Sequence, residues 1–383
     1  MQYEDTFTPI VTSGKNFHEL LDVMDRGNSE YPIARSHFPR FPNFQDCRTS
    51  PDYDFAFATD NRHMQAWARI PSPTDDKLYF MGAHSYLSGG YIYVIEKENM
   101  TDPGCMVWKK RLNNPYDEWG YFSHPSHFEN VGFGTSNTIV ALTANCYPNL
   151  SEGCDDESNS GVIFMDVSNP HNPTFISKFE TQLPKQPNEP DMTTFAKIGD
   201  KYVMAVINAK SAGYYQEGDV KRTVWTYSSD TFNEDDPASS FLNAPVATQI
   251  GAIGLDASSG EAIQNCKYIA NSAHANGDTY LICTYGDREP GTADNYFWGK
   301  RVETSGANIG QPTTGTARAD YLDIESGTPN GRIGFNELSL PYLCVFRAGA
   351  SLYVNKAGEL EVHCAGWEYS ESGVGVTAIT SAN

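Results

Sequence analysis

Four short runs near the start of the chain decide the fold: HMQAWARI (63–70), KLYFMGAH (77–84), GGYIYVIE (89–96) and CMVWKKRL (105–112). Aromatic and β-branched residues are frequent in the runs, and turn residues such as Gly, Pro, Asp and Ser lie between them. Such runs predict β-strands, and the short connections predict that neighbouring strands pair antiparallel. The stretch therefore predicts a sheet of four strands.

The same set of four runs recurs along the chain. The second set reads HFENVGFG (127–134), NTIVALTAN (137–145), GVIFMDVS (161–168) and TFISKFE (174–180). Further sets begin near residues 193, 265 and 351, so the period is about 60–85 residues. This pattern predicts an all-β β-propeller built from four-stranded blades. Five blades are recognisable, and six or seven stay open because residues 287–340 have room for more strands. A pair of β-sandwiches is the alternative fold.

We expect two regions, an N-terminal arm over residues 1–60 and the propeller over residues 61–383. The last set of strands has no obvious outer strand, and FTPIVTSG (7–14) has the residues to supply one. We expect Phe7–Val11 to pair with the last blade, because this pairing closes the ring and covers a sheet edge.

The net charge of the chain limits which classes of partner it can bind. The formal net charge is −21 and the isoelectric point is about 4.7. Such a surface repels nucleic acid and anionic membranes, and no apolar run approaches the roughly 18 residues of a membrane span. We therefore expect neither nucleic acid nor a membrane as partner, and we expect a monomer.

Eight cysteines indicate disulfide bonds. Cys146 and Cys154 bracket a short polar loop, and Cys266 and Cys283 fall on neighbouring strands, as do Cys344 and Cys364. The remaining pair is Cys47 and Cys105. Disulfides form in oxidising compartments, and the N-terminus lacks a signal-peptide pattern. We expect a mature chain of a secreted, extracellular protein.

One segment resembles a known repeat. GVIFMDVSNPHNPTFISKF (161–179) is similar to the LVIVD repeat of bacterial secreted β-propellers, in which an apolar strand runs into an Asp-Val-Ser turn and two prolines. Asp166 and Ser168 can bond the turn backbone, and Pro170 and Pro173 stop the strand from continuing. The resemblance implies the fold and no activity.

Histidines occupy corresponding places in several blades. His63 opens the first strand of the first set and His84 ends its second strand, while His124 and His127 flank the start of the second set. Because the first strands of propeller blades line the central channel, these imidazoles should converge at one end of it. His127, His124, Arg222 and Trp67 are our candidate substrate-binding residues.

The arrangement is also similar to the propeller polysaccharide lyases that cleave ulvan, in which two histidines of one blade act with a tyrosine and an arginine. His63 and His84 match the histidines, and Tyr147 matches the tyrosine. No arginine stands at the expected place after Tyr147, so Arg69, Arg62 or Arg222 would have to replace it, and Arg69 is our candidate. The resemblance implies β-elimination on an acidic polysaccharide, with these four residues as the catalytic group.

Other functions stay open. A non-catalytic, lectin-like propeller would bind a glycan or a protein through Trp67, Trp119, Tyr121, Trp298 and Trp367. Carboxylates for glycoside hydrolysis are present in Asp52, Asp54, Asp60, Asp75 and Asp76, which we interpret as solvated turn residues. We expect no cofactor; zinc at Cys266, His274 and Cys283, and weak calcium binding in residues 154–160, are the alternatives.

Overall fold

The computed structural model describes residues 33–37, 45–47, 64–72, 77–84, 89–98, 104–135, 137–146, 160–181, 191–208, 223–250, 262–270, 279–286, 296–314, 332–334, 351–354, 360–363 and 375–380. Among these residues, no helix has both the length and the apolar character needed to cross a membrane.

The strands form five sheets. The first contains β3 (Met64–Ile70), β4 (Leu78–His84), β5 (Gly90–Lys97) and β6 (Cys105–Leu112), with β2 (Gln45–Asp46) added in parallel to β6. The second contains β7 (His124–Asn130), β8 (Ile139–Asn145), β9 (Gly161–Asp166) and β10 (Thr174–Glu180). The third contains β11 (Met192–Ile198), β12 (Lys201–Ile207), β13 (Thr223–Ser229) and β14 (Val246–Ile250).

The fourth sheet contains β15 (Ala262–Ala270), β16 (Thr279–Gly286), β17 (Tyr296–Arg301) and β18 (Arg332–Gly334). The last contains β19 (Ser351–Val354), β20 (Leu360–His363), β21 (Gly375–Thr380) and β1 (Ile33–His37). Apart from β2, every strand pairs antiparallel with its neighbours.

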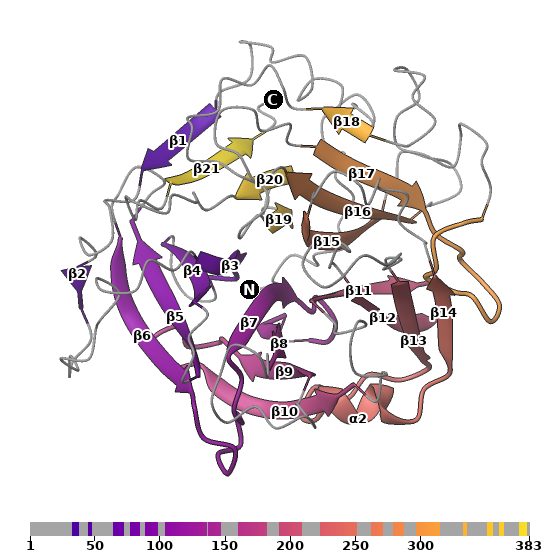
Figure 1. The fold of residues 1–383 in the computed structure, drawn as a ribbon, viewed down its shortest axis with the longest axis horizontal. Coiled ribbons are helices and arrows are strands. Elements are labelled where there is room, and N and C mark those ends of the chain that lie inside the picture. The colour runs from indigo at the N-terminus through magenta and orange to yellow at the C-terminus, as the bar shows by residue number, and fades with distance from the viewer. Residues whose placement is uncertain are drawn as a thin grey trace, which may run out of the picture.

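The sheets stand around a common centre, as Figure 1 shows. The first strands of the sheets, which we call the inner strands, are β3, β7, β11, β15 and β19. Each contacts the next in this order, and β19 contacts β3. The prediction of an all-β propeller is therefore confirmed.

The last sheet combines the two ends of the chain. Strand β1 pairs antiparallel with β21, with Ile33 opposite Ile379 and His37 opposite Gly375. The N-terminal region thus supplies the outer strand, and Ile33–His37 is the segment that does so. The segment that we expected in this place, Phe7–Val11, lies outside the described residues.

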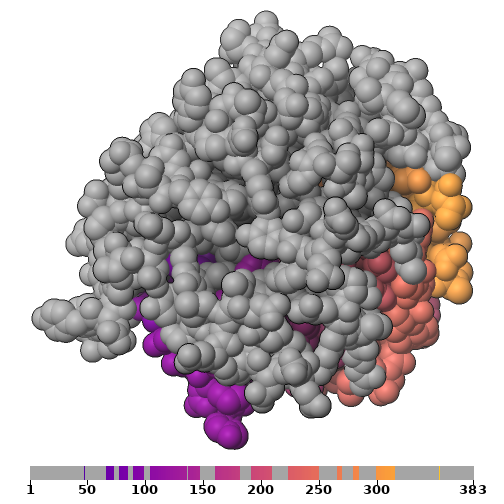
Figure 2. Space-filling model, viewed as in Figure 1, coloured from indigo at the N-terminus to yellow at the C-terminus, as the bar shows by residue number. Residues whose placement is uncertain are grey.

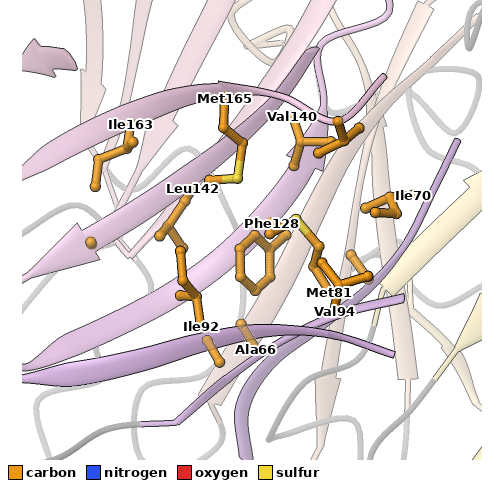
Figure 3. Packing of buried hydrophobic residues seen from close by; sticks show 14 of the residues in the cluster. Ala66, Ile70, Met81, Ile92, Val94, Phe128, Val140, Leu142, Ile163 and Met165 are labelled. Carbon is orange, nitrogen blue, oxygen red and sulfur yellow. The ribbon is translucent and has the colours of Figure 1, made fainter. Parts of the chain in front are cut away.

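Apolar side chains fill the space between neighbouring sheets. Between the first and second sheets, the ring of Phe128 lies in the middle of a cluster that includes Met81, Val94, Leu142 and Met165 (Figure 3). Burying one such side chain contributes about 1.5–3 kcal/mol. A similar cluster lies between the second and third sheets, and another between the third and fourth.

Two predicted disulfides are confirmed. Cys47, which follows β2, is bonded to Cys105 at the start of β6, and Cys266 is bonded to Cys283 on the paired strands β15 and β16. Cys146 is also disulfide-bonded, and no cysteine in the described part of the chain is free. Because Cys266 and Cys283 are joined to each other, neither is a thiolate available to zinc.

The turn between β9 and β10 has the predicted chemistry. The Asp166 carboxylate accepts hydrogen bonds from the Ser168 backbone N–H at 2.8 Å and from the Ser168 hydroxyl at 2.7 Å. It also accepts one from the Thr138 hydroxyl at 2.7 Å. A short helix that we did not predict, α2 (Pro237–Leu242), packs on β10 and β13, and Asp236 caps its N-terminus.

Candidate functional site

Polar residues gather at the end of the ring where the inner strands begin. At this end, Met64 pairs with His84 in the first sheet. His124 pairs with Asn145 in the second sheet, and Met192 pairs with Ile207 in the third. Because inner strands of a propeller run in the same direction, these pairs mark the same end in three sheets. The polar residues at this end, which we call the mouth, are His84, His124, Asn145, Asp191 and Asn208.

Asp191 is the carboxylate of the mouth. It directly precedes β11, and its residue is 8% exposed. The Asn145 side chain donates to Asp191 Oδ1 at 3.1 Å, and the Asp191 backbone N–H donates to the Ile207 carbonyl at 3.0 Å. The Asp191 carbonyl accepts from the Ser126 hydroxyl at 2.7 Å. These bonds fix the carboxylate between the second and third sheets.

Deeper in the ring, a second group of polar side chains crosses the centre. His127 Nε2 lies 2.7 Å from Asn265 Nδ2, and the Lys267 ammonium donates to the Glu129 carboxylate. All four residues are at most 4% exposed. We call them the axial layer. Because these buried side chains meet between β7 and β15, they fill that part of the ring's centre.

The bonds of His127 fix its tautomer. The Thr193 backbone N–H donates to His127 Nδ1 at 3.4 Å, so Nδ1 carries no proton. Burial, with the charge of Lys267 adding to it, lowers the pKa of His127 to about 3, so the ring is neutral. Its proton is therefore on Nε2, and the Asn265 amide must present its oxygen there. The two Asn265 amide atoms are assigned by this network.

Glu129 is too deep to act with Asp191. Burial raises the pKa of Glu129 to about 7, although the attraction of Lys267 opposes this shift. Glu129 lies three residues beyond Ser126, whose hydroxyl bonds the Asp191 carbonyl, and three residues span roughly 10 Å along a strand. The two carboxylates therefore belong to different levels of the ring, and Glu129 belongs to the structural axial layer.

The structure brings some of the predicted site residues together. His84 and His124 both lie at the mouth, His84 at 5% exposure and His124 partly exposed. His127 lies in the axial layer and is 2% exposed, so it is not placed to touch a glycan. Outside the described residues lie His63, Tyr147, Arg222, His274 and the five aspartates near the first blade.

Two other predicted residues lie away from the mouth. Arg69 is near the far end of β3, opposite Phe80, and its guanidinium lies 4.7 Å from the centre of the Tyr353 ring. Trp67 is 1% exposed and stacks on Phe80 with ring centres 5.1 Å apart. Its ring is thus a core side chain and offers no surface to a sugar. Trp119 and Tyr121 are likewise buried.

Sequence reasoning missed Asp191. One signal could have found it: Asp191 stands immediately before the first strand of the third set, as His63 stands immediately before β3. In a chain with 48 acidic residues, a single aspartate near a turn gave no reason to prefer it.

No protein-family model and no curated protein matches the chain. Several solved structures do match the chain, at low sequence identity. The GH32 β-fructofuranosidase of Bombyx mori is 11% identical, with a TM-score of 0.47, and the match covers 94% of this chain and 65% of that one. A Podospora anserina α-L-arabinofuranosidase is 9% identical, with a TM-score of 0.48 and coverage of 91% and 98%.

The Bacillus subtilis arabinanase is 11% identical, with a TM-score of 0.43 and coverage of 91% and 97%. The match to a Streptococcus pneumoniae sialidase covers only 36% of that chain. This chain thus spans less than two thirds of the length of the Bombyx mori enzyme. At such identities and scores, the comparison assigns no substrate or residue role.

The prediction of a polysaccharide lyase is wrong. The solved structures reported above carry the names of glycoside hydrolases, and none of them is named as a polysaccharide lyase. Within the chain, Arg69, which we considered for the lyase chemistry, lies near the opposite end of its strand from the mouth. Histidines at the ends of strands were therefore insufficient grounds for that reaction.

Proposed function

We propose that this chain is a propeller enzyme that hydrolyses a glycosidic bond at the mouth, with Asp191 as one of its carboxyl groups. Each sheet is taken as one blade, which makes a five-bladed ring. The disulfides support a secreted protein, because such bonds persist in oxidising compartments.

The observation that carries the proposal is the held carboxylate of Asp191. Glycoside hydrolysis uses a pair of Asp or Glu side chains, one of which protonates the leaving oxygen or activates the attack. Asp191 stands at the start of an inner strand, and Asn145 fixes its Oδ1 at 3.1 Å. The axial layer fills part of the ring's centre below the mouth, so we place the reaction at the mouth. The likeness to solved structures does not carry the proposal.

A second carboxyl group must complete the pair. In sequence, Asp60 is the nearest carboxylate before β3, as Asp191 is the nearest before β11. Asp60 is therefore the first partner to test. His84 and His124 stand at the mouth and can hydrogen-bond to sugar hydroxyls.

The experiment compares the release of reducing ends from arabinans, fructans and uronate polysaccharides by the wild type and by single variants. We expect Asp191→Asn to lower the rate by about 10²-fold or more, because an amide cannot exchange the proton. Asp230→Asn is the matched control, because that side chain is 78% exposed and pairs with Lys201. A wild type that binds a glycan but releases no reducing ends would make the propeller a binding module instead.

A further inference from the structure

The outer strands of a propeller expose backbone edges, and most of the described outer strands are protected. Strand β6 carries Lys109, Lys110 and Arg111, and charges of this kind discourage pairing with another chain. Strand β10 is covered by α2, whose Ala238 N–H donates to the Ser177 hydroxyl at 3.1 Å. Strand β18 is only three residues long.

Among the described residues, strand β14 lacks these protections, and its hydrogen bond with the segment after β17 runs from the Gln311 side chain to the Ala247 carbonyl at 2.9 Å. Its sequence is VATQI, and residues 237–255 contain no charged side chain, in a chain where 20% of residues are charged. Val246 is 50% exposed and Leu242, at the end of α2, is 61% exposed. These are two of the three large hydrophobic residues that are exposed in the described part of the chain. In Figure 1 this strand lies at the periphery of the ring.

The backbone of β14 also faces outward. The Ser228 N–H donates to the Pro245 carbonyl, and register places Thr226 opposite Ala247. Hydrogen-bonded pairs alternate along an antiparallel ladder, so Ala247 bonds toward β13. The N–H and C=O groups of Val246 and Thr248 therefore point away from the sheet. Figure 2 shows residues of this third sheet, in salmon, at the outer surface of the molecule.

We propose that β14 is a docking edge for a second copy of this chain, which pairs antiparallel with β14 of the first copy about Thr248. A two-fold pairing of this kind is the commonest symmetry of soluble oligomers. It continues the sheet across both molecules and includes the exposed apolar residue Val246 in the paired strand. It also replaces the sequence-based expectation of a strict monomer.

Charge favours a second copy at this strand over the other outer strands. Self-pairing of β6 would place Lys and Arg side chains against their own copies, which is destabilising. Self-pairing of β14 about Thr248 places no like charges opposite each other, and a Thr–Thr cross-strand pair is favourable. Dimerisation is still opposed by the long-range repulsion between two chains that each carry a formal charge of −21. Salt screens this repulsion.

The contact is small, so the dimer should be weak and should strengthen with salt. Sedimentation equilibrium of the full chain at several concentrations, in about 0.02 M and about 0.5 M NaCl, measures this directly. Thr248→Lys places two ammonium groups at the two-fold axis while leaving the bonds to β13 intact. Thr174→Lys makes the same substitution at the exposed first residue of β10, another outer strand, and is the matched control.

We expect a concentration-dependent dimer for the wild type that is more populated at high salt, the same behaviour for Thr174→Lys, and a monomer for Thr248→Lys. The melting temperature of each variant shows that the propeller is folded. A wild type that stays monomeric under all conditions would overturn the proposal. A Thr248→Lys variant that dimerises like the wild type, or a Thr174→Lys variant that also becomes monomeric, would overturn it too.

Discussion

The carboxylate of Glu129 on β7 accepts a hydrogen bond from the ammonium of Lys267 on β15, although β11 stands between their sheets in the ring. Two residues earlier on each strand, His127 meets Asn265. Both contacts join residues 138 apart in sequence. The second and fourth sheets are therefore aligned residue for residue across the centre of the propeller.

Removing one partner of the buried ion pair should be costly. Lys267→Met leaves the Glu129 carboxylate buried without its cation, and such changes cost about 3–5 kcal/mol. The double variant Glu129→Gln/Lys267→Met removes the uncompensated charge and should recover much of that loss. Urea unfolding followed by fluorescence gives the free energies. A double variant no more stable than Lys267→Met would show that the ion pair does not govern stability here.

The axial layer predicts how stability depends on pH. Folded His127 has a pKa of about 3, against 6.5 when unfolded, so the unfolded chain binds the proton first as pH falls. This contribution is present above pH 6.5 and is lost as pH falls toward 3. Folded Glu129 has a pKa of about 7, against 4.5 when unfolded, so its contribution is lost as pH rises from 4.5 to 7.

The two effects oppose each other between pH 4.5 and 6.5, and only that of His127 remains between 4.5 and 3. The His127→Gln variant should therefore lose less stability than the wild type as the pH falls from 4.5 to 3. Thermal melts at closely spaced pH values measure both slopes. Parallel curves for the two proteins would contradict the assignment of a neutral, buried His127.

Ring closure by β1 predicts the effect of truncation. Deleting residues 1–14 leaves Ile33–His37 in place and should change the melting temperature little. Deleting residues 1–38 removes β1, exposes the edge of β21, and should lower both stability and solubility. If the shorter deletion alone destabilises the protein as much as the longer one, residues 7–11 contribute to the ring as the sequence suggested.

Asn145 should act as a positioning residue for Asp191. Asn145→Ala removes the donor to Asp191 Oδ1 while leaving the carboxyl group itself, so kcat should fall by about tenfold and KM should change little. Asn145→Asp keeps the size of the side chain but places a second carboxylate against Asp191, and it should be slower and shift the pH profile. Unchanged kinetics in both variants would remove Asn145 from the site.

The strands were predictable because their signals are local. Alternation and turn chemistry located β3 to β10, although β7 begins at His124 and not at His127, and the role of Asp166 followed from the residues that surround it. The closing strand was not predictable in this way, because FTPIV (7–11) and IARSH (33–37) are both short sequences that could supply a strand, and only the long-range pairing with β21 identifies Ile33–His37. Helix α2 has six residues, too few to show a helical period.

The site was harder to predict, because how deep a side chain lies in the ring depends on its exact position within a strand. Trp67 and Arg69 are on an inner strand, as the sequence indicated, but Trp67 faces the core and Arg69 lies near the end away from the mouth. His124 and His127 differ by three residues, yet one lies at the mouth and the other in the axial layer. Asp191 carried no pattern of its own, because its role comes from Asn145 on a neighbouring sheet.

The masses of the products formed by the wild type and by Asp191→Asn test the central proposal most directly. Hydrolysis adds one water to each cleaved bond, so the wild type should release saturated oligosaccharides with intact masses, and Asp191→Asn should release them about 10²-fold more slowly or not at all. Asp230→Asn should match the wild type. Products that lack one water and absorb as unsaturated sugars, or an Asp191→Asn variant as active as the wild type, would contradict hydrolysis at the mouth.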